Sequence, residues 1–162
     1  MAAIVANNLW WPMKVVLQRV SCAQVCIDQA VVGQIGTGVL LLLGVAPEDD
    51  EAAADWLVEK VLALRIFPKP DDESATTTMQ LGLEDIAGQA LVVSQFTLFA
   101  DVAKGRRPSF SGAAAPEFAN HLYEYFVRKL SARVSVQTGR FGADMQVTST
   151  NDGPITLLLE KT

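Results

Sequence analysis

The stretch KVVLQRVSCAQVCIDQAVVGQIGTGVLLLLGV, residues 14–45, decides the fold. Apolar and β-branched residues alternate or run together in it, which predicts strands at residues 14–23, 24–27, 31–35 and 39–45. Asp28-Gln29 and the run at 36–38, Gly-Thr-Gly, supply turn residues between the strands. Connections of this length favour antiparallel pairing, so we expect the chain to begin with an antiparallel sheet.

The remaining chain alternates helices with further strands. Helical spacing of apolar residues predicts one helix at 49–64, after acidic residues, and another at about 116–133, where Pro116 is a favoured first-turn residue. Strands are expected at residues 65–67, 90–98, 134–138, 145–150 and 155–160, and a polar loop at 68–78. We therefore predict an α+β fold, a compact and β-barrel-like arrangement of antiparallel and mixed sheets with two main helices in a single domain.

Length and composition indicate one domain. The chain has 162 residues, half of them hydrophobic, which suits one sizeable core. Met13 stands directly before the first predicted strand, so we interpret residues 1–12 as an N-terminal extension or the result of an alternative start, and 13–162 as the domain. No apolar run approaches the roughly 18 residues of a membrane span, and membrane partners are not expected.

The two cysteines suggest a reducing compartment. Cys22 and Cys26 are four residues apart on a predicted extended segment, where they would lie about 13 Å apart. That distance is too long for a disulfide. A cytoplasmic location fits this pattern.

Side chains for the familiar hydrolytic sites are scarce. His121 is the only histidine, and a partly exposed place in the second predicted helix is a better interpretation than catalysis. Zinc would need more clustered ligands than this histidine and two cysteines, and the glycines do not match nucleotide-binding loops. No cofactor or metal is predicted. If the chain is an enzyme, backbone groups or the substrate must supply much of the chemistry.

The charges leave room for a local contact with nucleic acid. The formal net charge of -5 argues against broad attachment, which neutralises many phosphates. Lys104, Arg106 and Arg107 nevertheless form a dense positive cluster, with Phe110 nearby for stacking. From the residues alone, a phosphate contact and a solvated loop are equally good interpretations.

Two further segments stand out together. The sequence Ser94-Gln95-Phe96-Thr97-Leu98 ends the predicted strand at 90–98, and the sequence NDGPIT, residues 151–156, lies between the last two predicted strands. These segments resemble the two signature motifs of the D-aminoacyl-tRNA deacylase family. Further similar segments are at residues 17–20, 44–45, 65–67, 107–110, 123–127 and 137–145, so the resemblance covers the chain from Met13 to Thr162.

The resemblance implies a cytoplasmic hydrolase without a cofactor. It would cleave the ester bond of D-aminoacyl-tRNA, and of glycyl-tRNA mischarged on tRNA-Ala. It would be a homodimer in which the Gly153-Pro154 peptide is cis and enters the active site of the other subunit, as a backbone gate against L-residues. Arg19 would support this gate. The catalytic strand end would comprise Ser94, Gln95, Phe96 and Thr97.

The resemblance also implies how tRNA is used. Phe141 is similar to the family residue that meets the terminal adenine, and an aromatic face stacks on any base. Lys104, Arg106 and Arg107 are candidates for contact with the rest of the aminoacylated 3′ end. The ribose 2′-hydroxyl of the tRNA is implied as a catalytic group, which agrees with the absence of a side-chain base. Ser94 and Thr97 are the alternative nucleophiles.

The sequence departs from the family pattern in two places and leaves rival functions open. Residues 76–81 replace a Lys-Met-Asn-Leu type segment near Met79, and Ile155 stands where Val or Phe is more usual. One rival is a non-catalytic RNA- or DNA-binding dimer, and another is a structural dimer assembled through exposed β edges. A third is a paralogue that deacylates a small L-aminoacyl-tRNA.

Overall fold

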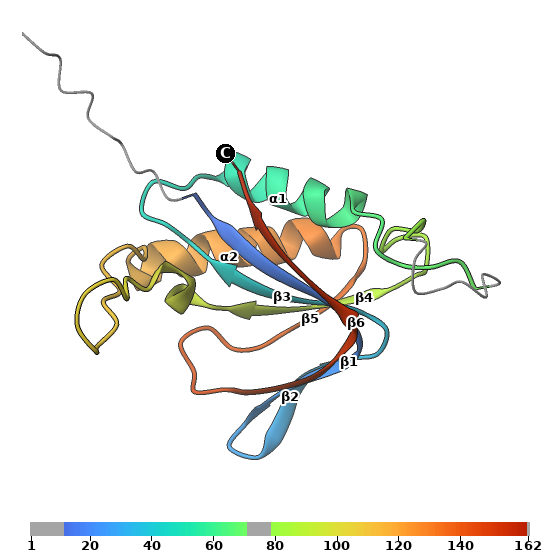
Figure 1. Ribbon diagram of the computed structural model, residues 1–162, viewed down its shortest axis with the longest axis horizontal. Helices are drawn as coiled ribbons and strands as arrows, with labels where there is room; N and C mark the ends of the chain where they lie inside the picture. The colour runs from blue at the N-terminus through green and yellow to red at the C-terminus, as the bar shows by residue number, and fades with distance from the viewer. Residues whose placement is uncertain (1–11, 71–78, 162) are drawn as a thin grey trace, which may run out of the picture.

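The apolar segments near the start of the chain fold into strands, and the remaining chain adds helices and further strands to them (Figure 1). The computed structural model describes residues 12–70 and 79–161. The strands are β1 (Lys14–Ile27), β2 (Ala30–Ile35), β3 (Gly38–Gly44), β4 (Gln89–Ser94), β5 (Ser135–Thr138) and β6 (Gln146–Glu160). The helices are α1 (Glu51–Ala63), α2 (Pro116–Ser131) and the short 3-10 helix η1 (Phe96–Phe99).

β1 is the strand around which the sheet is built. It pairs antiparallel with β3 through residues 14–20, with β2 through residues 23–27, and with β6 along most of its length. β3, β4 and β5 are parallel neighbours. β2 also lies close to β5. A Cβ atom added to Gly33 of β2 would overlap the carbonyl oxygen of Thr138 in β5. The sheet therefore nearly closes, and the predicted α+β, barrel-like fold is confirmed.

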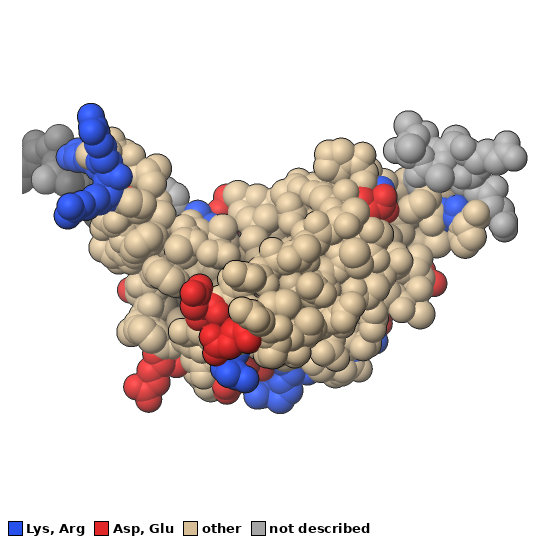
Figure 2. All heavy atoms as spheres, turned by 90° about the horizontal axis from the view of Figure 1, so that it is seen from below, with Lys and Arg blue, Asp and Glu red and all other residues tan. Residues whose placement is uncertain are grey.

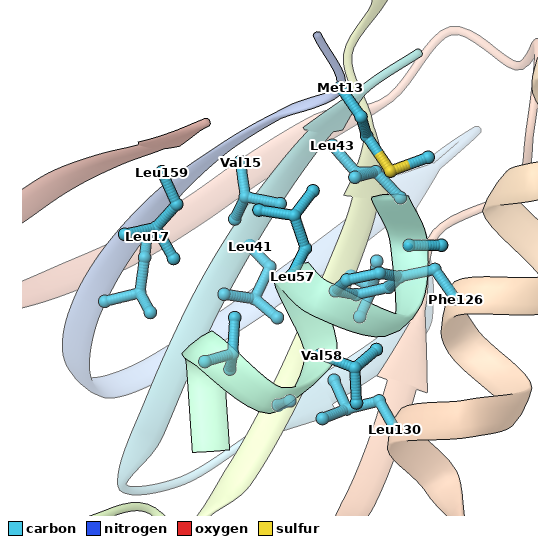
Figure 3. Packing of buried hydrophobic residues seen from close by; sticks show 14 of the residues in the cluster. Met13, Val15, Leu17, Leu41, Leu43, Leu57, Val58, Phe126, Leu130 and Leu159 are labelled. Atoms are coloured by element: carbon cyan, nitrogen blue, oxygen red, sulfur yellow. The ribbon is translucent and has the colours of Figure 1, made fainter. Parts of the chain in front are cut away.

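The larger core lies between the sheet and the two helices, which run side by side over one face (Figure 1). Figure 3 shows strand residues packed against residues of both helices: Met13, Val15, Leu17, Leu41, Leu43, Leu57, Val58, Phe126, Leu130 and Leu159. β4 is buried on both faces, since Ala90 and Val92 join this core while Leu91 and Val93 join a second core inside the curl of the sheet. Its continuous apolar sequence follows from this double burial.

Both long helices begin with favourable residues. The Asp50 carboxylate caps α1 by accepting a hydrogen bond of 2.8 Å from the backbone N–H of Ala53. Pro116 is the first residue of α2, as predicted. No helix within the described residues is long and apolar enough to cross a membrane. Cys22 and Cys26 are free, as the strand spacing predicted.

Two predicted strand boundaries are wrong because a neighbouring strand runs past them. Residues 14–23 and 24–27 form the single strand β1, which β6 accompanies on one side. Residues 145–150 and 155–160 belong to the single strand β6, because β1 pairs with both of its halves. Residues 152–155 are therefore a bulge within a strand, opposite Arg19, and not a turn between two strands.

The strand predicted at 90–98 is wrong beyond Ser94. The backbone N–H of Gln95 donates to the Leu43 carbonyl at 2.7 Å, but β3 ends one residue later and offers no further ladder. The chain turns into η1, and Phe99 packs so closely that a Cβ atom on Gly44 would lie 2.9 Å from its ring. Residues 65–67 contribute only an isolated bridge, from Phe67 to Leu81. Residues 1–11, and residues 71–78 of the predicted loop, lie outside the described residues.

Candidate functional site

A hollow of about 510 Å³ lies at the carboxyl end of β4. Ser94, Gln95 and Phe96 line it from the strand end, and Phe141 lines it from the segment after β5. Most of the remaining lining is apolar, and as a set it was not predicted: Val45, Val93, Phe110, Ala113, Ala114, Pro116, Ala119, Gly142, Ala143, Met145 and Val147. The run of small residues just before Pro116 was the available signal, because short side chains leave space. None of these lining side chains is charged.

Main-chain bonds fix the strand end. The ladder bond from Gln95 to Leu43 sets where the strand stops, and the N–H of Leu98 donates to the Gln95 carbonyl at 3.2 Å. The side-chain amide of Gln95 donates to the hydroxyl of Thr97. Because Leu98 makes the first bond of η1, the N–H groups of Phe96 and Thr97 precede the intrahelical bonds. The strand end thus offers backbone donors beside the hollow.

None of the described residues that line the hollow carries a side-chain base. His121 does not line it, and its imidazole is 64% exposed on α2 with a Glu51 oxygen 3.6 Å away. Ser94 lines the hollow with no histidine, lysine or carboxylate among its other lining residues. Within residues 12–70 and 79–161, no cluster of His, Cys, Asp and Glu is suited to hold a metal ion. The arrangement suits chemistry that uses backbone dipoles and groups brought by the substrate.

Phe141 is held by a tight turn. The N–H of Ala143 donates to the Arg140 carbonyl at 3.2 Å, and Gly142 has a φ of +74°, a value that favours glycine. The Arg140 N–H points to the sulfur of Met145 at 3.4 Å. These contacts hold the turn that places Phe141 in the lining of the hollow.

Tyr123 supports both the ring and the strand, a role that was not predicted from the sequence. Its ring lies 6.0 Å from that of Phe141, and its hydroxyl donates to the Val92 carbonyl at 2.9 Å. Burial raises the pKa of Tyr123 to about 12, although a hydrogen bond with Thr138 acts in the opposite direction. The neutral phenol therefore joins α2, β4 and the Phe141 turn.

The second motif forms the exposed bulge of β6. Asp152, Gly153 and Pro154 are exposed, and the Gly153-Pro154 peptide is cis, as the resemblance implied. The side chain of Asn151 closes the base of the bulge. It accepts a hydrogen bond from the N–H of Ile155 and donates one to the hydroxyl of Thr156, both at 2.9 Å.

Arg19 anchors the bulge from below. Its side chain is 8% exposed, and its Nε donates to the Asp152 carbonyl at 2.9 Å and lies 3.2 Å from the Asp152 carboxylate. Its Nη1 donates to the Ile66 carbonyl at 2.6 Å. One buried guanidinium therefore ties the bulge to the chain before Phe67.

The bulge and the hollow are apart within one chain. The bulge faces Arg19, whose partner on β3 is Val39, and Val39 pairs with Ala90 of β4. From the bulge, Ser94 lies three strand spacings away across the sheet, which is about 14 Å. It also lies four residues further along the strand direction, which is about 13 Å. No residue of the bulge lines the hollow.

The positive cluster projects from the loop between η1 and α2. A pair of backbone hydrogen bonds between Asp101 and Ser109, of 2.7 and 2.9 Å, closes this loop. Lys104, Arg106 and Arg107 lie exposed beyond it, and no described carboxylate forms an ion pair with them. In Figure 2, Lys and Arg atoms gather at the end of the molecule where Figure 1 has this loop.

Known proteins resemble the chain over nearly its full length. Residues 16–160 match the family described as D-Tyr-tRNA(Tyr) deacylase. Proteins named D-aminoacyl-tRNA deacylase from Picosynechococcus and from Pelobacter propionicus are each 51% identical over 150 residues, which is 92% of this chain and 97% and 100% of theirs. The relative of the same name from Clostridioides difficile is 51% identical over 149 residues, 91% of this chain and 97% of its own.

Two solved structures share the fold. One, named c-Myc DNA Unwinding Element Binding Protein, has a TM-score of 0.83 at 38% identity and covers 92% of this chain and 99% of its own. The other, a probable eukaryotic D-amino acid tRNA deacylase, has a TM-score of 0.79 at 20% identity and covers 93% of this chain and 100% of its own. The second likeness bears on the fold alone.

Proposed function

This chain belongs to the D-Tyr-tRNA(Tyr) deacylase family and is a D-aminoacyl-tRNA deacylase, and we propose that it selects its substrate with a backbone gate contributed by a second copy of itself. The observation that carries the proposal is the separation of the two signature motifs. One motif lines an uncharged hollow, and the other is an exposed bulge on a different strand of the same chain. A homodimer would bring the bulge of one subunit to the hollow of its partner.

The surface of the chain suits such an assembly. β6 pairs only with β1 among the described strands, so its other edge is open, and Val147 and Leu158 on it are 40% and 57% exposed. The face seen in Figure 2 shows few charged atoms across its centre. A broad, weakly charged face is the kind of surface that a stable dimer covers.

The bulge would select by rejection. Its backbone oxygens at Gly153 and Pro154 would accept hydrogen bonds from the α-amino group of a D-residue, whose side chain points away from the bulge. The side chain of an L-residue would collide with the bulge instead. Glycine has no side chain to collide, so glycyl-tRNA mischarged on tRNA-Ala is a further substrate in this proposal. Arg19 keeps the bulge in position through its bond to the Asp152 carbonyl.

The strand end would stabilise the transition state. Water attacks the ester carbonyl carbon, and the negative charge on the carbonyl oxygen is met by the backbone N–H groups of Phe96 and Thr97. The ester bond to the 3′ oxygen then breaks, and the proton lost by the water passes to that oxygen by way of the ribose 2′-hydroxyl. Ser94 and Gln95 position the substrate, and no side chain is acylated.

The tRNA end would be bound by a ring and by charges. Phe141, in the segment after β5, stacks on the terminal adenine. The side chains of Lys104, Arg106 and Arg107 contact the next phosphates of the tRNA. No described carboxylate forms an ion pair with these three side chains. Reaction takes place in the cytoplasm, where charged tRNA is found.

Release of tyrosine from matched D- and L-tyrosyl-tRNA tests the proposal. The D-ester should be hydrolysed and the L-ester left largely intact. Equal rates would refute the gate, and no release from either ester would refute the activity itself. A tRNA that ends in 2′-deoxyadenosine should be hydrolysed much more slowly, whereas unchanged hydrolysis would remove the 2′-hydroxyl from the mechanism.

Binding to DNA is a second candidate, because a 38% identical structure is named for binding a DNA element. The exposed positive cluster would supply the contacts. The net charge of -5 keeps such binding weak at physiological salt. Filter binding of duplex and single-stranded DNA at 150 mM salt, about physiological ionic strength, distinguishes this role from deacylation.

A further inference from the structure

Two phenylalanine rings at the mouth of the hollow are unusually exposed. Phe96 is 53% exposed and Phe110 is 39% exposed, although both line the hollow. Large aromatic side chains left open beside a binding site often contact a ligand. The reaction proposed above uses the backbone of Phe96 but neither of the two rings.

The rings pair in a way that leaves their faces open. Their centroids are 5.1 Å apart and their planes meet at 72°, an edge-to-face arrangement. In such a pair, the edge of one ring covers a single face of the other. The exposed fractions of both side chains leave ring area that can stack on a flat, uncharged group such as a nucleobase.

The backbone holds both rings before any substrate arrives. Phe96 is the first residue of η1, directly after the ladder bond of Gln95. Phe110 follows the closing bonds between Asp101 and Ser109, and its own carbonyl accepts a hydrogen bond of 3.1 Å from Ala113. A preformed pair of this kind loses little conformational entropy on binding.

The pair also adjoins the positive cluster. Phe110 is three residues after Arg107, a chain distance of at most about 10 Å. Exposed aromatic rings next to lysine and arginine side chains are the combination that binds single-stranded nucleic acid, with bases stacked and phosphates paired. Figure 2 shows the positive atoms at the same end of the molecule as this loop.

We propose that Phe110, paired with Phe96, stacks on the base of the nucleotide that precedes the terminal adenosine of the tRNA. This inference rests on the proposed function and adds a second base site to the one at Phe141. Lys104, Arg106 and Arg107 would hold the adjoining phosphates. The site accepts any base, because every base has a π-face.

The test compares Phe110→Leu with the unchanged protein on two forms of D-tyrosyl-tRNA, one natural and one abasic at the penultimate nucleotide. Stacking is worth roughly 1–3 kcal/mol per base, so KM for the natural form should rise roughly 5- to 150-fold with kcat preserved. On the abasic form, the variant and the unchanged protein should have the same KM. Phe118→Leu is the matched control, since this ring is 38% exposed on α2 and does not line the hollow.

The inference is overturned if Phe110→Leu raises KM for the natural and the abasic substrate by the same factor. The ring would then contact the terminal adenosine or the amino acid. It is also overturned if the variant changes the oligomeric state in size-exclusion chromatography, which would place the ring at a subunit contact. The dissociation constants of natural and abasic deacylated tRNA can be compared in the same way for both proteins. Because this measurement needs no hydrolysis, it separates a failure of this inference from a failure of the proposed activity.

Discussion

The strand end and the bulge carry the two signature motifs, and they are held in place by different kinds of contact. At residues 94–97, the main chain of β3 sets the position through the bond between Gln95 and Leu43. At residues 152–155, the β-ladder is interrupted, and the side chains of Arg19 and Asn151 replace it. A side-chain substitution should therefore displace the bulge much more than it displaces the strand end.

The largest effect is expected from Gly153→Ala. Gly153 has a φ of +134°, and an added Cβ would lie 2.9 Å from Ile155 and 3.3 Å from the Arg19 guanidinium, so the bulge must shift. A displacement of about 1 Å in a positioning element costs on the order of 100-fold in activity. We expect kcat/KM for D-tyrosyl-tRNA to fall by at least about this factor. Gly36→Ala, in the turn before β3 with nothing closer than 3.6 Å, is the control and should retain full activity.

A smaller effect is expected from Arg19→Lys. An ammonium cannot reach both the Asp152 and Ile66 carbonyls, and hydrogen bonds of charged groups are worth about 1.5–3 kcal/mol. The free energy of unfolding in urea should fall by about that amount, and the ratio of D- to L-ester hydrolysis should fall with it. An unchanged ratio in a destabilised protein would show that Arg19 serves the fold alone. Asp152→Asn keeps the carbonyl and should preserve the ratio.

Tyr123→Phe probes the strand end and should cost less. It removes one hydrogen bond to the Val92 carbonyl, worth about 1 kcal/mol of unfolding free energy, while the ring beside Phe141 remains. Because the ladder holds the strand, kcat/KM should change less than with Arg19→Lys. If Tyr123→Phe loses more activity than Arg19→Lys, the strand end depends more on side-chain contacts than the bulge does.

The same substitution has a pH signature. The pKa of Tyr123 is about 12 in the folded protein and 10.0 in the absence of the fold. Between these values the unfolded chain releases the proton that the folded chain retains. The contribution of Tyr123 to the free energy of unfolding is therefore fully present below pH 10 and is lost as the pH rises to about 12. Urea unfolding of Tyr123→Phe should show a smaller fall over this range.

The smallest effect is expected from His121→Asn, outside both regions. This side chain is 64% exposed and its neighbour Glu51 is 55% exposed. Surface substitutions of this kind change stability by no more than about 0.5 kcal/mol. A large loss of kcat/KM in this variant would give the imidazole a role that the structure does not support.

Predictions from the sequence were most accurate where the pattern was local. The helices α1 and α2 and the strands β2 and β3 end within a residue or two of their predicted bounds, because spacing, caps and turn residues act over a few positions. The two motifs were also found in the sequence, and the roles of Phe141 and Arg19 stay predictions. The bounds of β4 and β6 were missed, since they depend on where β3 ends and on how far β1 extends beside them.

The sequence alone determined that the chain has no evident nucleophile and base pair, and the family resemblance drew attention to the motifs at residues 94–98 and 151–156. Only the tertiary structure decided where these motifs lie. The hollow arises where the segment after β5 and the start of α2 meet the end of β4, and those segments are far apart in the sequence. The separation of the bulge from the hollow likewise follows from strand order, since β1 and β3 lie between β6 and β4. Periodicity records which residues are buried, but it does not record which strands become neighbours.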